Sequence, residues 1–165
     1  MDNLSLAPIT ANFGVPGLAA GTTTTYTITT AFNYAIRGKS YNKGTASNAA
    51  TPTTDVNTLV AFTAQAIGTG CVYLWLVNSS GTVAVAQGTT VTLDATGAFV
   101  NLPQFPAIPD GYCPFAYEVV RLAPSTATTP AVATWTMGVN NQSSVTGVTY
   151  ARADISTLTD DLQAS

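Results

Sequence analysis

Residues 71–87 read Cys71-Val-Tyr-Leu-Trp-Leu-Val77, Asn78-Ser-Ser-Gly81 and Thr82-Val-Ala-Val-Ala-Gln87, and they hold the clearest local pattern in the chain. The β-branched and aromatic residues of the two flanking runs favour strands. Gly81 can adopt the positive φ that closes a tight turn. The stretch therefore predicts an antiparallel hairpin.

Neither face of the first strand in this hairpin is polar. Successive side chains of a strand point to opposite faces, and here the even positions carry Val72, Leu74 and Leu76 while the odd positions include Tyr73 and Trp75. Both faces must be covered. One interpretation is a central strand of a sandwich, and the other is a subunit interface formed by the aromatic face.

Strand-like runs bounded by Gly, Pro, Asn or Ser recur from Thr22 onward. They predict nine or ten short strands, at Thr24–Thr30, Asn33–Lys39, Leu59–Ala64, Cys71–Val77, Thr82–Gln87, Thr90–Asp94, Phe99–Leu102, Phe115–Leu122, Ala133–Gly138 and Val148–Asp154. This pattern predicts an all-β fold, either a β-sandwich or a jelly-roll-like barrel of short antiparallel strands. Residues 44–57 and 123–133 are expected to be exposed loops, and no convincing helix appears.

The length of 165 residues suits one domain with two terminal extensions. Residues 1–21 contain scattered Pro and Gly without a sustained period and predict an extended arm, residues 22–155 the sandwich, and residues 156–165 an irregular tail. The arm includes Leu4, Leu6, Ile9 and Phe13, which we expect to pack on the domain or on a neighbouring subunit. A loosely ordered terminus is the alternative.

Charged residues make up only 8% of the chain, which carries a formal net charge of −3. Soluble domains contain about 25% charged residues. Charge repulsion between this surface and its neighbours is therefore weak, which favours a component of an assembly. Five basic residues are too few for a nucleic-acid partner. The sequence predicts neither a transmembrane segment nor a secretory signal, which indicates synthesis in a cytoplasm.

Catalytic chemistry has few candidate groups in this chain, which contains no histidine. Ser-His and Cys-His activation are therefore excluded, and the cysteines and carboxylates have no metal-ligand spacing. Asp110 lies in the turn signature Pro-Asp-Gly. Glu118 is expected to face water or to pair with Arg121. We predict a protein that is not an enzyme and needs no cofactor or metal.

Two small groups of residues leave alternatives open. Arg37, Lys39 and Lys43 form either a solvated strand face or an electrostatic contact to an acidic protein surface such as a capsid shell. Cys71 and Cys113 are expected to be buried free thiols, with a disulfide as the alternative.

Several segments together resemble a group of small virion proteins of tailed bacteriophages. They are Tyr41–Asp55, Gly70–Val72, Pro103–Tyr117 with its Pro-Asp-Gly-Tyr-Cys-Pro core, and Val145–Tyr150 before Leu158. The resemblance implies a capsid decoration (cement) protein on the virion surface, with the major capsid protein and further copies of itself, as a dimer or trimer, as partners. The alternative is a tail fibre, spike or baseplate module that binds a host-surface glycan. The expected interface residues are Leu4, Leu6, Ile9, Phe13, Arg37, Lys39, Lys43, Tyr73 and Trp75.

Overall fold

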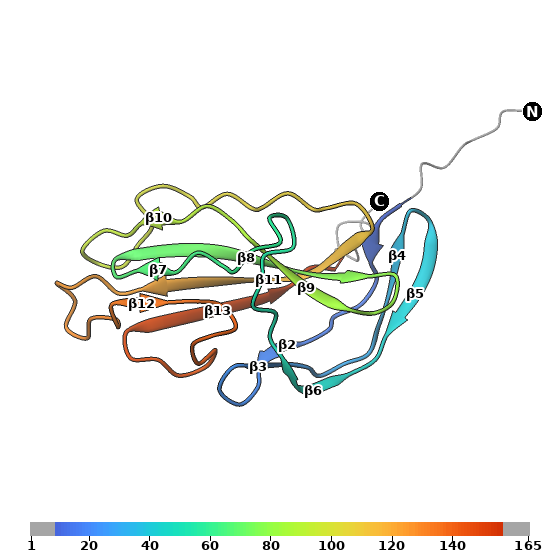
Figure 1. The fold of residues 1–165 in the computed structure, drawn as a ribbon, viewed down its shortest axis with the longest axis horizontal. Helices are drawn as coiled ribbons and strands as arrows, with labels where there is room; N and C mark the ends of the chain where they lie inside the picture. Colours follow the sequence, from blue (N-terminus) through green and yellow to red (C-terminus); the bar gives the residue numbers. More distant parts are fainter. Residues whose placement is uncertain (1–8, 157–165) are drawn as a thin grey trace, which may run out of the picture.

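The structure, a computed structural model, describes residues 9–156 and is an all-β sandwich, as predicted. The central sheet has the order β10-β8-β11-β13, with β9 paired to β8. Its strands are β8 (Thr69–Asn78), β9 (Val83–Gln87), β10 (Val91–Thr92), β11 (Tyr112–Leu122) and β13 (Val148–Asp154). Figure 1 shows the long strands β8, β11 and β13 running side by side.

Two three-stranded sheets and a two-stranded ribbon accompany the central sheet. One sheet is β1 (Ala11–Asn12), β4 (Phe32–Ile36) and β5 (Lys39–Lys43); the second is β2 (Leu18–Ala20), β3 (Thr25–Ile28) and β6 (Ala46–Ala50); the ribbon is β7 (Gln65–Ala66) with β12 (Thr134–Trp135). In Figure 1, β4 and β5 lie at one end of the central sheet and β2, β3 and β6 lie below it. All of these strands pair antiparallel.

The core lies between the central sheet and these smaller sheets. Aromatic rings meet across it, with ring centroids 5.1 Å apart for Tyr26 and Trp75 and 5.3 Å apart for Phe32 and Phe115. Such tilted pairs add to the stability gained from burial alone. The odd-numbered face of β8 therefore points into the sandwich.

The predicted hairpin of residues 71–87 is confirmed. β8 and β9 pair from Tyr73 with Gln87 to Val77 with Val83, and Gly81 closes the turn with φ 77°. The Asn78 side chain accepts hydrogen bonds from the backbone of Ser80 and Thr82 inside this turn. The last predicted strand coincides with β13.

Other predicted strands differ from the structure. The run from Asn33 to Lys39 is broken because Arg37 and Gly38, with φ of 50° and 78°, form a two-residue turn between β4 and β5. Residues 59–64 and 99–102 contain only isolated bridges at Ala61 and Phe99. Residues 44–57, expected to be a loop, include β6, whose alanines pair with β3 despite their low strand propensity.

The sandwich begins earlier than the predicted boundary at residue 22. β1 pairs with β4 and β2 pairs with β3, so residues 11–20 contribute to the sheets. The Asp154 carboxylate fixes this segment by accepting hydrogen bonds from the backbone N–H groups of Gly17 and Leu18, at 2.8 and 3.1 Å. Leu4, Leu6 and most of the predicted tail lie outside the described residues.

None of residues 9–156 forms a helix. Within this range there is accordingly no helix long and apolar enough to cross a membrane.

Candidate interaction surface

The outer face of the central sheet, opposite the core, is crossed by an extended segment, residues 99–109, which we call the strap. The Phe105 ring packs edge-on against Tyr117 of β11 at 5.4 Å. The guanidinium of Arg121 lies over the Phe99 ring at 4.4 Å. The Thr89 N–H donates a 3.3 Å hydrogen bond to the Gln104 carbonyl, and the Gln104 N–H donates one of 2.8 Å to the Thr89 hydroxyl, which secures the middle of the strap. These contacts hold irregular backbone in a defined position.

Two glycines provide the space for the strap. A Cβ atom at Gly88 would lie 2.3 Å from the carbonyl oxygen of Gln104, and one at Gly70 would lie 2.5 Å from the Phe99 ring. Both distances are too short for any side chain. The strap can therefore approach β8 closely only because these two positions carry no side chain.

An apolar groove of about 510 Å³ lies between the strap and the outer face of the sheet. It is lined by Val72, Phe99, Leu102, Pro103, Phe105, Tyr117, Val119 and Arg121. Leu102 is 85% exposed and Phe105 56% exposed. Large exposed apolar side chains beside a groove are typical of a surface that another molecule covers.

A second exposed apolar feature lies beside the strap. We call Leu59 and Val60 the knob; these side chains are 80% and 60% exposed. The Asn57 side chain next to the knob donates a 2.9 Å hydrogen bond to the Ala107 carbonyl of the strap. The knob, the strap and the groove together form a surface that we call the strap face.

The strap face has almost no charge. Between Asp55 and Asp94, and again between Asp94 and Asp110, the sequence contains no charged residue. Asp55 is buried, and among the described residues that line the groove Arg121 alone is charged. Depletion of charge and exposure of apolar side chains characterise the cores of protein–protein interfaces.

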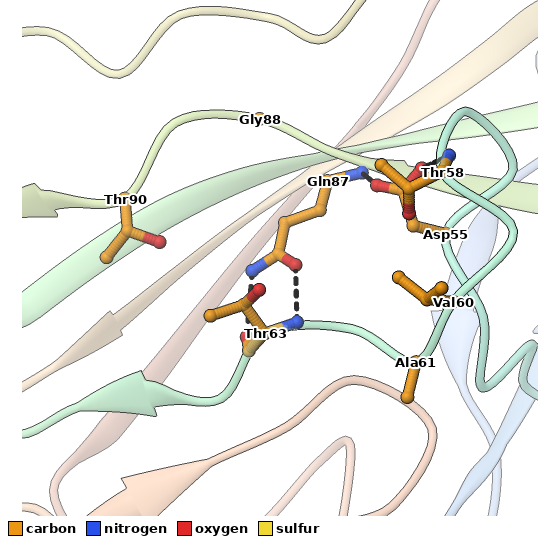
Figure 2. Close-up of a pocket in the computed structure, with 8 residues that line it drawn as sticks. All are labelled: Asp55, Thr58, Val60, Ala61, Thr63, Gln87, Gly88 and Thr90. Carbon is orange, nitrogen blue, oxygen red and sulfur yellow. Dashed lines mark hydrogen bonds between the residues drawn. The ribbon is translucent and has the colours of Figure 1, made fainter.

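A hollow of about 290 Å³ lies between the knob and the edge strand β9 (Figure 2). Its one carboxylate, Asp55, accepts hydrogen bonds from the backbone N–H groups of Asn57, Thr58 and Gln87. The Gln87 amide exchanges two hydrogen bonds with the Thr63 backbone. These polar groups are engaged in holding the loop, so the hollow offers a structural network rather than an acid or base for catalysis.

The three predicted cations do not share one strand face. Arg37 lies in the β4–β5 turn and pairs with Asp110 at 2.9 Å, so the prediction that it extends the strand of Lys39 is wrong. Lys39 lies over the Tyr41 ring at 5.5 Å. Lys43 donates a 2.9 Å hydrogen bond to the Gly81 carbonyl. Each cation is thus paired locally, although Arg37 and Lys39 remain exposed.

Other predicted interface residues divide between the surface and the core. Ile9 and Phe13 are 57% and 43% exposed and remain available for contacts. Tyr73 and Trp75 are almost completely buried in the core of their own chain, so their assignment to a subunit interface is wrong and the alternative, a central sandwich strand, is confirmed. The strap covers part of the opposite face of β8, which explains why neither face is polar.

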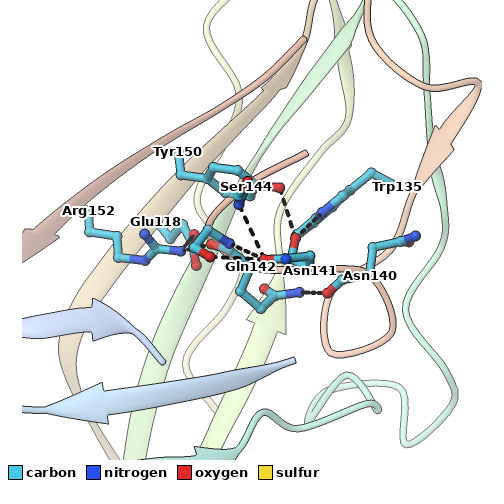
Figure 3. A network of polar contacts seen from close by, with 9 residues as sticks. Glu118, Trp135, Asn140, Asn141, Gln142, Ser144, Tyr150 and Arg152 are labelled. Atoms are coloured by element: carbon cyan, nitrogen blue, oxygen red, sulfur yellow. Dashed lines mark hydrogen bonds and ion pairs between the residues drawn. The ribbon is translucent and has the colours of Figure 1, made fainter. Parts of the chain in front are cut away.

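Glu118 occupies a buried position, contrary to the prediction that it faces water or pairs with Arg121. Its side chain is 1% exposed and its Oε1 atom lies 2.5 Å from the Arg152 guanidinium on the neighbouring strand β13. Burial raises the pKa of Glu118 to about 7, although the charge of Arg152 and the indole of Trp75 favour the ionised form. Figure 3 shows this pair beside the 140–144 loop.

The loop at residues 140–144 completes the polar network around the ion pair. Arg152 donates a 2.6 Å hydrogen bond to the Gln142 carbonyl. The Tyr150 hydroxyl and the Trp135 indole N–H both donate to the Asn141 carbonyl. The space beside Glu118 is too small to hold a water molecule. The network therefore ties the loop to the sheet and offers no route for a substrate.

The remaining residues considered for catalysis or metal binding lie in a turn or in the core. Asp110 lies in a turn, with Gly111 at φ 82°, as its Pro-Asp-Gly context predicts. Cys71 and Cys113 are buried free thiols, which confirms that prediction. Among residues 9–156 no group of three or more Cys, Asp or Glu side chains could hold a metal ion.

No protein-family model, curated protein or solved structure matches this chain. Function therefore has to be inferred from the chemistry of the surface. The sequence already contained a partial signal for the strap face, namely two long uncharged stretches that include Leu59, Leu102 and Phe105. The prolines at 103, 106 and 109 exclude a regular strand there, but only the fold shows that the segment lies over a sheet.

Proposed function

We propose that this chain is a structural protein of a bacteriophage particle that binds the outer capsid shell and stabilises it. The observation that carries the proposal is the strap face, where Leu59, Leu102 and Phe105 are exposed on a surface with almost no charge. Exposed apolar groups on a rigid β scaffold favour a lasting contact with another protein. The resemblance of Pro103–Tyr117 to phage virion proteins supplies the class of partner.

Stabilisation of the shell requires no chemistry. A protein that binds the mature shell and not its precursor or its dissociated subunits shifts the equilibrium toward the mature shell. Many weak contacts per particle become tight when copies also bind one another. Ile9 and Phe13, exposed near the start of the described chain, would supply a second contact to the shell or to a neighbouring copy.

A tail module that binds a host glycan is the less favoured alternative. Sugar rings stack on exposed aromatic side chains, and tryptophan is common in that role. Trp75 and Trp135, the two tryptophans of the chain, are 2% and 0% exposed. The strap exposes two amide side chains, Asn101 and Gln104, but residues 99–109 contain neither a tryptophan nor a carboxylate.

Co-sedimentation with phage heads tests the proposal. Heads of the phage that encodes the chain, prepared without this protein, are mixed with wild type, with a Leu102→Asp/Phe105→Asp variant, and with Val139→Asp. Val139 is 62% exposed but lies away from the strap, so it is the matched control. We expect the wild type and the control to sediment with mature heads and the double variant to lose most binding. Absence of wild-type binding, or equal binding by all three, would contradict the proposal.

A further inference from the structure

Leu59 combines two features that are unfavourable in the isolated chain. Its side chain is 80% exposed, and its backbone has φ 60°, in the left-handed region that side chains other than Asn, Asp and Gly rarely adopt. An exposed leucine gains little from packing, so burial within the chain does not offset the strain. Such outliers are commonly found at functional sites.

The loop below Leu59 is built to maintain this conformation. The Leu59 N–H donates a 2.8 Å hydrogen bond to the Asp55 carbonyl, and the Asp55 N–H donates one of 2.9 Å to the Val60 carbonyl. The Asp55 carboxylate, 6% exposed as a residue, accepts from the N–H groups of Asn57 and Thr58 at 2.6 and 3.2 Å. These bonds fix the backbone on both sides of Leu59. Figure 2 shows the Asp55 carboxylate beside Thr58 in this loop.

Two further hydrogen bonds join the loop to the rest of the molecule. The second carboxylate oxygen of Asp55 accepts from the Gln87 N–H of β9 at 2.8 Å. The Asn57 side chain donates to the strap carbonyl of Ala107 at 2.9 Å. The knob is thereby a rigid apolar projection whose position relative to the groove is fixed.

We infer that Leu59 is the anchor of the interface with the capsid shell and inserts into an uncharged apolar pocket of the shell protein. This inference rests on the proposed function and names the residue and the partner chemistry that would carry it. A loop whose backbone is already held in its bound conformation loses little backbone entropy on binding. A few residues carry most of the binding energy of an interface, and leucine is less common among them than Trp, Tyr or Arg. Asp55 is a positioning residue that acts through the backbone of the knob.

The chemistry of the partner pocket follows from the surroundings of the knob. The two side chains are aliphatic, and no charged residue follows Asp55 before Asp94 in the sequence. A pocket that carried an unpaired charge would lose the solvation of that charge on binding and receive no counter-charge. The matching surface is therefore aliphatic, with a rim of uncharged donors and acceptors.

A pair of glycine substitutions separates the anchor role from the strain. Leu59→Gly removes the side chain and relieves the positive φ, whereas Thr23→Gly relieves the same kind of strain, at φ 52°, at an exposed position away from the knob. Leu59→Ala is the second variant, because it truncates the side chain and keeps the backbone restriction. Affinity for mature heads made without this protein is measured for all three, together with the melting temperature of the free protein.

We expect Leu59→Gly and Leu59→Ala to lose at least tenfold in affinity while Thr23→Gly binds like wild type. The melting temperature of Leu59→Gly should equal or exceed that of wild type, since a structural role would lower it. If Leu59→Gly binds heads within twofold of wild type, the anchor inference is wrong while the proposed function stands. A large loss of stability in Leu59→Gly would have the same meaning. A wild type that does not bind heads would overturn the proposed function and the inference with it.

Discussion

At the scale of single residues, the buried ion pair of Glu118 and Arg152 makes stability depend on pH. Burial raises the pKa of Glu118 to about 7, above the ordinary value of about 4.3 that applies in the unfolded chain. Between these values the folded state binds more protons than the unfolded state. The free energy of unfolding should therefore fall as pH rises from about 4.5 to 7, by on the order of 2 to 3 kcal/mol from this group.

Glu118→Gln tests this account because the amide cannot ionise. We expect its free energy of unfolding, measured in urea, to change much less between pH 5 and 7.5 than that of wild type. Asp110→Asn is the control, since Asp110 forms an exposed pair with Arg37 and should retain the wild-type slope. A Glu118→Gln protein with the full wild-type decline would show that another group is responsible.

The two cysteines should be inert in the folded protein. Cys71 lies opposite Val120 and Cys113 opposite Val77, so the cysteines are six positions apart along β8. That separation of about 20 Å is far beyond disulfide reach, and burial raises the pKa of each thiol to about 11. We expect no alkylation by iodoacetamide at pH 8 under native conditions and labelling of both thiols in denaturant. Rapid labelling of the native protein would contradict their burial.

Sequence reasoning failed at single residues whose partners are distant in the chain. Glu118 follows the alternation of β11, but its partner Arg152 lies on β13, and nothing local indicates that the Glu118 side of the strand faces the core. The residues around Arg37 favour a strand and predict one there. The turn at Arg37 depends on a positive φ that the Arg-Gly sequence permits without requiring.

At the scale of elements, the strap depends on the two glycines beneath it. Gly88→Ala would place a Cβ 2.3 Å from the Gln104 carbonyl and 2.7 Å from Val72. We expect it to lower the free energy of unfolding by about 2 kcal/mol, as overpacking does. Gly44→Ala has no atom within 4 Å of the new Cβ and should change stability by less than about 0.5 kcal/mol. Urea unfolding of both variants gives the comparison, and equal stabilities would mean that the strap is not tightly seated.

Elements with strong local signals were predictable from the sequence. The β8–β9 hairpin has two runs of β-forming residues and a glycine turn, and β13 begins with the β-branched and aromatic run Val148-Thr-Tyr150. In contrast, β1, β2 and β6 all contain alanine, and β1 and β6 also contain asparagine. These strands form because neighbouring strands offer them hydrogen bonds. Pairing of this kind is a property of the fold, and residue preferences in a single segment do not reveal it.

At the scale of the whole molecule, the two sides of the sandwich differ. The inner face of the central sheet buries its aromatic residues against the smaller sheets. The outer face is covered by a strap that itself exposes Leu102 and Phe105. The sequence predicts the strap face only in part. The low charge of the chain indicates that some surface is covered, but it does not indicate which surface.

The most direct test of the proposed function is an electron cryomicroscopy map of the phage particle in which we propose that this protein lies. The account predicts density for the sandwich in hundreds of copies on the outer shell, with the strap face, including Leu59 and Leu102, against the shell. A few copies confined to the tail, or a strap face that points to solvent in every copy, would contradict it.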